Sequence, residues 1–222
     1  MCFKEWPALI ILRAPKTRGK LNASPVGKIL VVLFFVGIVA WRVKETFYKQ
    51  GDTRGQTTML WSFYVLFALS CLIFGGTVFE FFLVDRPFHG LVSWAGVAIF
   101  VLANLIRIRA IQALGRFWSL HVEIRAQHDF VREGPYRYVR HPAYLSFILE
   151  HIAVPLVGNA WWSLLVAIVV YVPMLLWRWR QEEIALCEKF GDSYRAYQME
   201  VGALFPRWSA FRGARRTSAG SS

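Results

Sequence analysis

Two groups of polar side chains, separated by about forty residues, could together bind a charged ligand. The residues concerned are Arg140, His141, Pro142 and Tyr144 in the first group, and Glu182 and Glu183 in the second. Proline is favoured in the first turn of a helix, so the first group predicts a helix that starts at Pro142. A helix start presents unpaired N–H groups and a partial positive charge, which can hold a carboxylate or a phosphate. Adjacent glutamates at a membrane boundary are costly unless a cation is bound, so the second group indicates a cationic ligand.

Each group also has a structural interpretation that needs no ligand. Arginine and tyrosine side chains anchor helices at membrane interfaces, which would account for Arg140 and Tyr144. Arg178 and Glu182 have the i,i+4 spacing of an ion pair on a solvated helix. His151 lies seven residues after Tyr144 on the same helix face, where it either lines a pocket or serves as a hydrogen-bonded structural histidine.

The composition predicts an all-α integral membrane protein. Of the 222 residues, 56% are apolar and 18% are charged, and the mean hydropathy is +0.39, values that exclude a soluble globular domain and a disordered chain. A helix needs about 20 residues to span the hydrocarbon, and its range is about 17 to 25. Five apolar stretches are candidates: 26–41, 59–84, 90–106, 143–157 and 160–177. The fourth is short and meets the fifth across only Gly158 and Asn159, so we expect about five transmembrane helices with a tight helical hairpin. Glu80 and Asn104 lie within these stretches, and we assign both to helix packing.

The basic residues predict which side of the membrane carries the polar groups. With the N-terminus outside, 19 of the 26 Lys and Arg residues fall on the cytoplasmic side, in segments 42–58, 107–140 and 178–222. This distribution predicts a cytoplasmic active site and a cytoplasmic C-terminus. It also explains the net charge of +12 by contact with anionic lipid, so the expected partner is the bilayer and not nucleic acid.

The chain divides into four segments. They are a basic N-terminal arm (1–25), the N-terminal transmembrane helices (26–114), a catalytic region (115–208) and a disordered tail (209–222). Within the catalytic region, residues 120–124 alternate in polarity and predict a short strand, and residues 184–190 predict an amphipathic helix that ends at Gly191. No metal site or disulfide framework is expected, because the three cysteines lie far apart in the sequence: Cys2, Cys71 and Cys187.

Four motifs occur together in the second half of the chain: residues 114–119 (LGRFWS), 134–144 (GPYRYVRHPAY), 180–183 (RQEE) and 190–197 (FGDSYRAY). Together they resemble the isoprenylcysteine carboxyl methyltransferase and phospholipid methyltransferase family of integral membrane enzymes. The resemblance covers roughly residues 114–208. It implies an S-adenosyl-L-methionine-dependent methyltransferase whose cofactor is held between the helix that starts at Pro142 and the helix of Glu182 and Glu183. With the orientation predicted from the basic residues, this cofactor pocket lies on the cytoplasmic side. The positions that it carries over as cofactor-binding are His141, Pro142, Tyr144, Glu182 and Glu183.

Three positions depart from the pattern of that family. Ser146 and Ala153 stand where the family usually has glycine, and Gly202 stands where it commonly has proline. Ser146 and Ala153 are still small, so close approach of the helices remains possible. The change at Gly202 is expected to matter little.

The cofactor must be held by residues at the membrane boundary, because no Gly-x-Gly-x-x-Gly motif follows a predicted strand. Either glutamate could bind the cofactor's amino group or its ribose hydroxyls, while His141, Tyr144 and the helix start could hold its carboxylate. The rings of Tyr144, Trp177 and Trp179 could contact the adenine or the sulfonium through a cation–π interaction.

The methyl acceptor is expected to be lipophilic and to enter laterally from the lipid. A carboxylate acceptor needs no general base, and Arg140 is our first choice to orient it, with Arg137 and Arg178 as alternatives. An amine or a thiol would have to lose a proton, and His151 or His141 would then be the candidate base. The catalytic candidates are therefore Arg140 and His151.

The leading functional prediction is a membrane methyltransferase that acts on a lipid-like or prenylated acceptor. Phospholipid N-methylation and the S-methylation of a small thiol are the alternatives within this enzyme class. An NADPH-dependent membrane reductase is more distant, because the chain is short for one. A membrane scaffold would explain the apolar helices but not the joint occurrence of the two polar groups. The enzymatic interpretation requires Tyr144 and Glu182 to lie close together.

Overall fold

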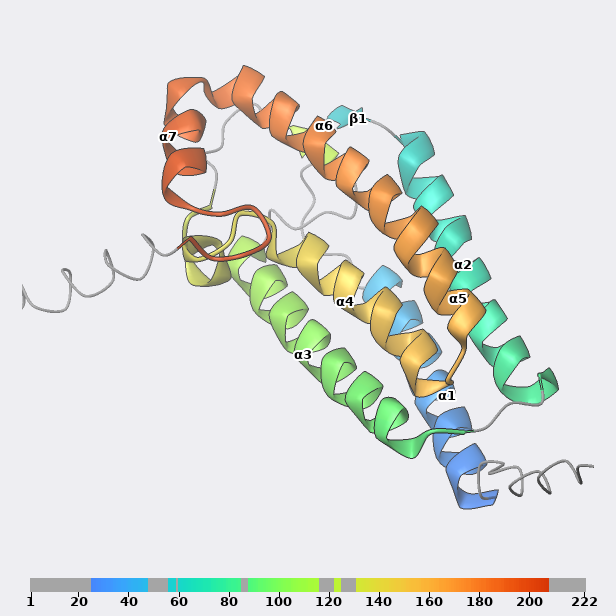
Figure 1. The fold of residues 1–222 in the computed structure, drawn as a ribbon. Helices are drawn as coiled ribbons and strands as arrows, with labels where there is room; N and C mark the ends of the chain where they lie inside the picture. Colours follow the sequence, from blue (N-terminus) through green and yellow to red (C-terminus); the bar gives the residue numbers. More distant parts are fainter. Residues whose placement is uncertain are drawn as a thin grey trace, which may run out of the picture.

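The computed structural model describes residues 25–47, 56–58, 60–84, 88–115, 122–124 and 131–207, and this part of the chain is predominantly helical (Figure 1). The helices are α1 (Pro25–Phe47), α2 (Leu60–Leu83), α3 (Gly90–Leu114), the 3₁₀ turn η2 (Gly134–Arg137), α4 (Pro142–Val157), α5 (Trp161–Val166), the π-helical turn η3 (Ala167–Tyr171), α6 (Val172–Phe190) and α7 (Asp192–Glu200). The expected N-terminal arm, apart from Pro25, and the expected tail at 209–222 lie outside the described residues.

Each of the five apolar stretches lies in a helix. By length and composition, three helices of the described residues could cross a membrane: Trp61–Leu83, Gly90–Leu114 and Trp161–Phe190. The last of these joins α5, η3 and α6 without a break. Val26–Ile38 and Pro142–Val157 are shorter apolar helices. The structure thus supports a helical membrane protein, while the crossing of α1 and α4 stays a prediction.

A short pair of strands is the exception to the helical architecture. The strand expected at 120–124 is present as β2 (Val122–Ile124), and it pairs in antiparallel fashion with β1 (Gln56–Thr58). The sequence analysis did not predict β1, because three residues without an apolar side chain carry no periodic signal.

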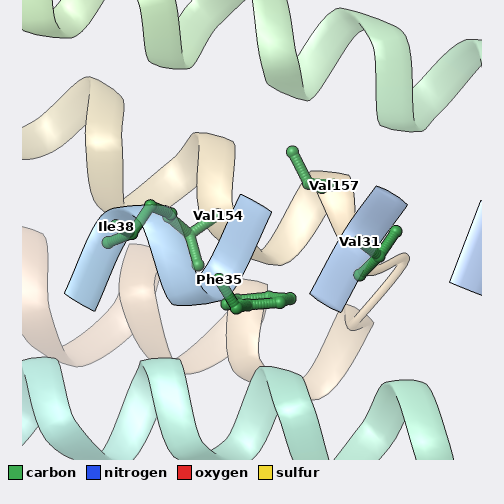
Figure 2. Close-up of a cluster of buried hydrophobic side chains, with 5 residues drawn as sticks. All are labelled: Val31, Phe35, Ile38, Val154 and Val157. Atoms are coloured by element: carbon green, nitrogen blue, oxygen red, sulfur yellow. The ribbon is translucent and has the colours of Figure 1, made fainter. Parts of the chain in front are cut away.

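The hairpin of α4 and α5 lies between the other helices. In Figure 1, α3 runs alongside α4, and α2 runs alongside α5 and α6. The contact of α3 with α4 is close because Gly96 has no side chain: a Cβ atom there would lie 2.7 Å from the backbone nitrogen of Val157 and 2.9 Å from the carbonyl oxygen of Ala153. Helix α1 packs against the end of α4 through one apolar cluster, shown in Figure 2, of Val31, Phe35, Ile38, Val154 and Val157.

Two polar side chains fix the turn of this hairpin. The carboxylate of Glu80 in α2 accepts hydrogen bonds from the backbone N–H groups of Ser163 (2.7 Å) and Trp162 (3.2 Å). These groups have no partner within their own helix, so Glu80 caps α5 from a neighbouring helix. Asn159, at a positive φ of 52°, accepts a hydrogen bond from the backbone N–H of His89 (2.9 Å). Glu80, which we assigned to helix packing, therefore acts as a cap.

A buried ion pair accommodates the charge within α4. Arg107 of α3 lies 3.1 Å from Glu150 of α4, and both side chains are only 2% exposed. The guanidinium of Arg107 also lies 4.4 Å from the centre of the Phe147 ring. Pairing is what allows such groups inside an apolar bundle, because an isolated charge there would be strongly destabilising.

Removing the cap on α5 should destabilise the bundle. We expect Glu80→Ala to lower the free energy of unfolding by about 1 to 2 kcal/mol, because two N–H groups lose their acceptor. Glu80→Gln should cost less, since its amide oxygen can still accept. Thermal unfolding in detergent measures both effects against Glu188→Ala, an exposed position on α6. Equal unfolding midpoints for Glu80→Ala and Glu188→Ala would contradict the capping role.

Candidate active site

The helix start predicted at Pro142 is present in the structure. Helix α4 begins at Pro142, with His141 as the residue before it, and the backbone of His141 adopts φ −126° and ψ 61°. The carbonyl of His141 accepts the hydrogen bond from the N–H of Leu145 (3.1 Å). The side chain of His141 makes no capping bond to the helix, so it is available for other contacts.

The two polar groups predicted from the sequence meet between α4 and α6. The hydroxyl of Tyr144 donates a hydrogen bond of 2.5 Å to Oε2 of Glu182. Tyr144 lies in the first turn of α4, and Glu182 lies in the second half of α6. The condition set by the sequence analysis, that these two residues lie close together, is therefore met.

Glu183 is the centre of a second set of contacts beside the first. Its Oε1 accepts hydrogen bonds from Nε of Arg140 (2.8 Å) and Nε2 of His141 (3.0 Å). Two residues of α7 also donate to its carboxylate, Tyr194 at 3.4 Å and Gln198 at 3.3 Å. The Glu183 side chain is 17% exposed, against 7% for Arg140 and 5% for His141. Glu183 therefore joins the start of α4 to α7, whereas Glu182 contacts Tyr144.

The guanidinium of Arg140 is directed at protein acceptors. Besides Glu183, it donates to the backbone carbonyls of Gln198 (3.0 Å) and Val201. The sequence analysis expected Arg140 to orient the methyl acceptor. In the structure, its donors hold the end of α7 and the segment that follows.

His151 lies deeper in the helical bundle than this site. Its Nδ1–H donates to the carbonyl of Phe147 (2.9 Å), its Nε2 lies 2.8 Å from Oγ of Ser70, and its ring stacks on Tyr171 with the centroids 3.7 Å apart. The residue is 3% exposed. These contacts match the structural interpretation that we left open for this histidine.

The four remaining candidates have different neighbours. Trp179 lies beside His141, with ring centroids 5.7 Å apart, whereas Trp177 contacts Trp61. The buried side chain of Arg178 donates to the hydroxyl of Ser62 in α2 (2.7 Å). Arg137 is exposed at the end of η2. Of the two tryptophans, only Trp179 is thus placed next to the motif histidine.

The packing of α7 adds residues that the sequence analysis did not single out. The hydroxyl of Tyr197 donates to the carbonyl of Tyr136 in η2 (2.5 Å), and burial raises the pKa of Tyr197 to about 12. This phenol is therefore protonated at neutral pH and keeps its hydrogen bond. Burial also raises the pKa of Tyr194. Tyr194 and Gln198 are four residues apart, a spacing that could have marked them as one face directed at the site.

The hydrogen-bond donors and acceptors between α4 and α6 fit a ligand that carries a positive and a negative charge. Glu182 and Glu183 supply carboxylates, and the first turn of α4 presents N–H groups. In addition, Nε1 of Trp179 is buried and has no hydrogen-bond partner within the described part of the chain. A buried donor without an acceptor is unfavourable by about 1 to 3 kcal/mol, so a ligand oxygen at this nitrogen would be stabilising.

Comparison with known proteins agrees with this arrangement. Residues 96–188 match the isoprenylcysteine carboxyl methyltransferase (ICMT) family. The match includes α4 and the glutamate pair of α6, and it confirms the resemblance drawn from the motifs.

Individual relatives of the chain include methyltransferases. The Protein-S-isoprenylcysteine O-methyltransferase of Schizosaccharomyces pombe is 29% identical over 62% of this chain and 63% of its own length. Methanethiol S-methyltransferase 1 of Bradyrhizobium diazoefficiens is 37% identical over 32% of this chain and 24% of its own length. The chain spans 57% to 63% of the length of the first three curated relatives that it matches. These similarities support a methyltransferase as the class of enzyme.

A solved structure shares the fold. The structure of the eukaryotic intramembrane Ras methyltransferase ICMT aligns with a TM-score of 0.52 and 21% identity, over 67% of this chain and 53% of that chain. The helical architecture described above is therefore an ICMT-like fold.

Loss of the Glu183 carboxylate should loosen α7. We expect Glu183→Ala to lower the local stability of α7 by about 1 to 3 kcal/mol, because Arg140 loses its anionic partner. The amides of residues 192–200 should then exchange with deuterium about 5 to 150 times faster, the factor that corresponds to this loss of stability. Glu182→Ala is the matched control, since Glu182 contacts Tyr144 in α4 instead. Similar exchange in the two variants would contradict the assignment of α7 docking to Glu183.

Proposed function

We propose that the chain is an S-adenosyl-L-methionine-dependent membrane methyltransferase that acts on a lipid-like or prenylated acceptor. The observation that carries the proposal is the contact of Tyr144 with Glu182, which joins the start of α4 to α6. A scaffold protein would have no need for the two polar groups of residues, one before and in α4 and one in α6, to meet at one place. The similarity of residues 96–188 to the ICMT family supports the same reaction class.

The side chains around this contact would hold the cofactor. Glu182 would take the amino group or the ribose hydroxyls of the cofactor. Its partner in the structure is the neutral hydroxyl of Tyr144, which the cofactor can displace without leaving a charge unpaired. His141, Pro142 and the first turn of α4 would face the carboxylate. Trp179 would donate its buried N–H to an oxygen of the ligand. Glu183, with Arg140 and His141 bound to it, would hold the frame of the site.

The cofactor would supply an electrophilic methyl group, so the chain has to provide alignment and a dry environment for an acceptor. Of the acceptor classes, we favour a carboxylate, because it needs no general base. Both ring nitrogens of His151 already have protein partners, which argues against its use as a base. For Arg140 to orient a carboxylate, it would have to exchange one of its present partners. Arg178, the neighbour of Ser62 and Tyr144, is the alternative for this role.

Methylation of a small thiol is the second candidate. The similarity to methanethiol S-methyltransferase 1 favours it, although that match covers only 32% of this chain. A thiol must lose its proton, and His141 is then the histidine within the site that could accept it. A lipid-soluble acceptor would enter through the apolar surface of the helices. The distribution of basic residues supports a site on the cytoplasmic side of the membrane.

Cofactor binding should depend on Glu182. We expect detergent-purified protein to bind S-adenosylhomocysteine in calorimetry. We expect Glu182→Ala to weaken this binding at least about tenfold, since a charge-assisted hydrogen bond is lost. Tyr144→Phe should have a smaller effect, and Glu188→Ala on the exposed face of α6 should have none. If Glu182→Ala binds as tightly as the wild type, the cofactor assignment is wrong.

The chemistry of the product identifies the acceptor. Incubation of the purified protein with methyl-labelled cofactor and an extract of lipids and prenylcysteines should yield a labelled methyl ester, which releases methanol in alkali. With a carboxylate acceptor, the rate should change little between about pH 6 and 9, because the acceptor is ionised throughout. A product that is stable in alkali, together with a rate that rises with pH, would show that the acceptor is a thiol or an amine and not a carboxylate.

A further inference from the structure

The segment that follows α7 turns back to the start of α4, as Figure 1 shows in red. The backbone N–H of Arg140 donates to the carbonyl of Gly202 (2.9 Å), and that of His141 donates to the carbonyl of Ala203 (3.0 Å). Val139 and Gly202 form a parallel bridge. We call residues 201–207 the strap. It holds the backbone of the two residues that directly precede α4.

Two arginines fasten the strap to the end of α7. Arg140 donates to the carbonyls of Gln198 and Val201. From the other end of the strap, Arg207 donates to the carbonyls of Gln198 (3.0 Å) and Met199 (2.6 Å). The last carbonyls of a helix have no partner within it, so these contacts satisfy them. The strap is thus fixed at both of its ends.

The turn of the strap requires a glycine at position 202. A Cβ atom on Gly202 would lie 1.9 Å from the carbonyl oxygen of Phe205 and 3.2 Å from its carbonyl carbon. Both are backbone atoms, so no side-chain rotation can relieve the clash. A larger residue must open the turn between Gly202 and Phe205, and it would shift the carbonyls that hold Arg140 and His141.

The strap, and not a capping side chain, holds the backbone where the chain enters α4. His141 makes no side-chain bond to the first turn of α4, and Pro142 fixes only its own φ angle. The orientation of the backbone at His141 is therefore set mainly by two hydrogen bonds, which the N–H groups of Arg140 and His141 donate to carbonyls of the strap. The ring of His141 has to reach Glu183 and Trp179 from this peptide.

We propose that the strap is a positioning device for the cofactor site and that Gly202 is its essential residue. This inference rests on the proposed methyltransferase function. Gly202 would not contact the ligand itself. It acts through the backbone of Arg140 and His141, so its replacement changes the geometry of the cofactor-binding residues while the helical bundle stays intact.

Substitution of Gly202 tests the proposal. In detergent-purified full-length protein, we expect Gly202→Ala to weaken S-adenosylhomocysteine binding at least tenfold, with a thermal unfolding midpoint close to that of the wild type. Because the strap acts on the cofactor side, KM for the cofactor should rise more than KM for the acceptor. Gly75→Ala is the matched control, since a Cβ there meets no atom within 4 Å.

A double substitution separates positioning from a general loss of stability. If Gly202 acts through His141, Gly202→Ala should weaken binding only slightly further in a His141→Ala background. Independent, multiplicative losses would overturn the proposal, as would wild-type affinity in Gly202→Ala. Should Gly202→Ala fail to fold, Arg207→Ala provides the test. We expect Arg207→Ala to weaken S-adenosylhomocysteine binding, by a smaller factor than Gly202→Ala, and unchanged affinity would overturn the proposal. A wild type that does not bind the cofactor refutes the proposed function itself.

Discussion

Charged side chains in this protein have to be paired, because the helices that carry them are apolar enough to lie in a bilayer. Three places in the described part of the chain show how the structure meets this constraint. Glu80 caps α5, Glu150 pairs with Arg107 between α3 and α4, and Glu183 pairs with Arg140 and His141 where α4 begins. The first two contacts fasten helices to one another. The third lies beside Trp179, whose buried Nε1 has no hydrogen-bond partner within the described residues, and beside Glu182, which is why we place the site there.

The same constraint divides the roles of two adjacent glutamates. Glu183 accepts hydrogen bonds from Arg140 and His141, directly before α4, and from residues of α7, so it joins the two segments. Glu182 has the hydroxyl of Tyr144 as its partner, and a tyrosine can release a carboxylate at a lower free-energy cost than a buried arginine can. A ligand cation can therefore compete for Glu182, whereas displacing Glu183 would disrupt α7. In the proposed site, a single motif would thus combine a residue that binds the cofactor with a residue that holds α7 in place.

Much of this arrangement could be predicted from local sequence. The apolar stretches predict the helices, Pro142 predicts the start of α4, and Gly191, at a φ of 56°, ends α6 as expected. The approach of Tyr144 to Glu182 could be expected from the family resemblance. Other contacts between residues distant in sequence could not be predicted, because no periodic pattern marks them. Gly202 is the clearest case: the sequence analysis treated it as a minor departure, and only the position of the Phe205 carbonyl shows why a glycine stands there. Arg140 is another, since two of the acceptors of its guanidinium are backbone carbonyls, which any residue could supply.

The two other departures from the family pattern show how a close helix contact is kept when its glycine is replaced. Ala153 is fully buried, and it faces Gly96 of α3. The glycine that permits the close contact therefore lies in α3 and not in α4. Ser146 is also buried, and its hydroxyl donates to the carbonyl of Ala143 (2.7 Å) within its own helix, so it needs no partner from the site. Neither replacement pushes the helices apart. From the first turn of α4, Tyr144 reaches Glu182 in α6, which is the contact that the proposed chemistry requires.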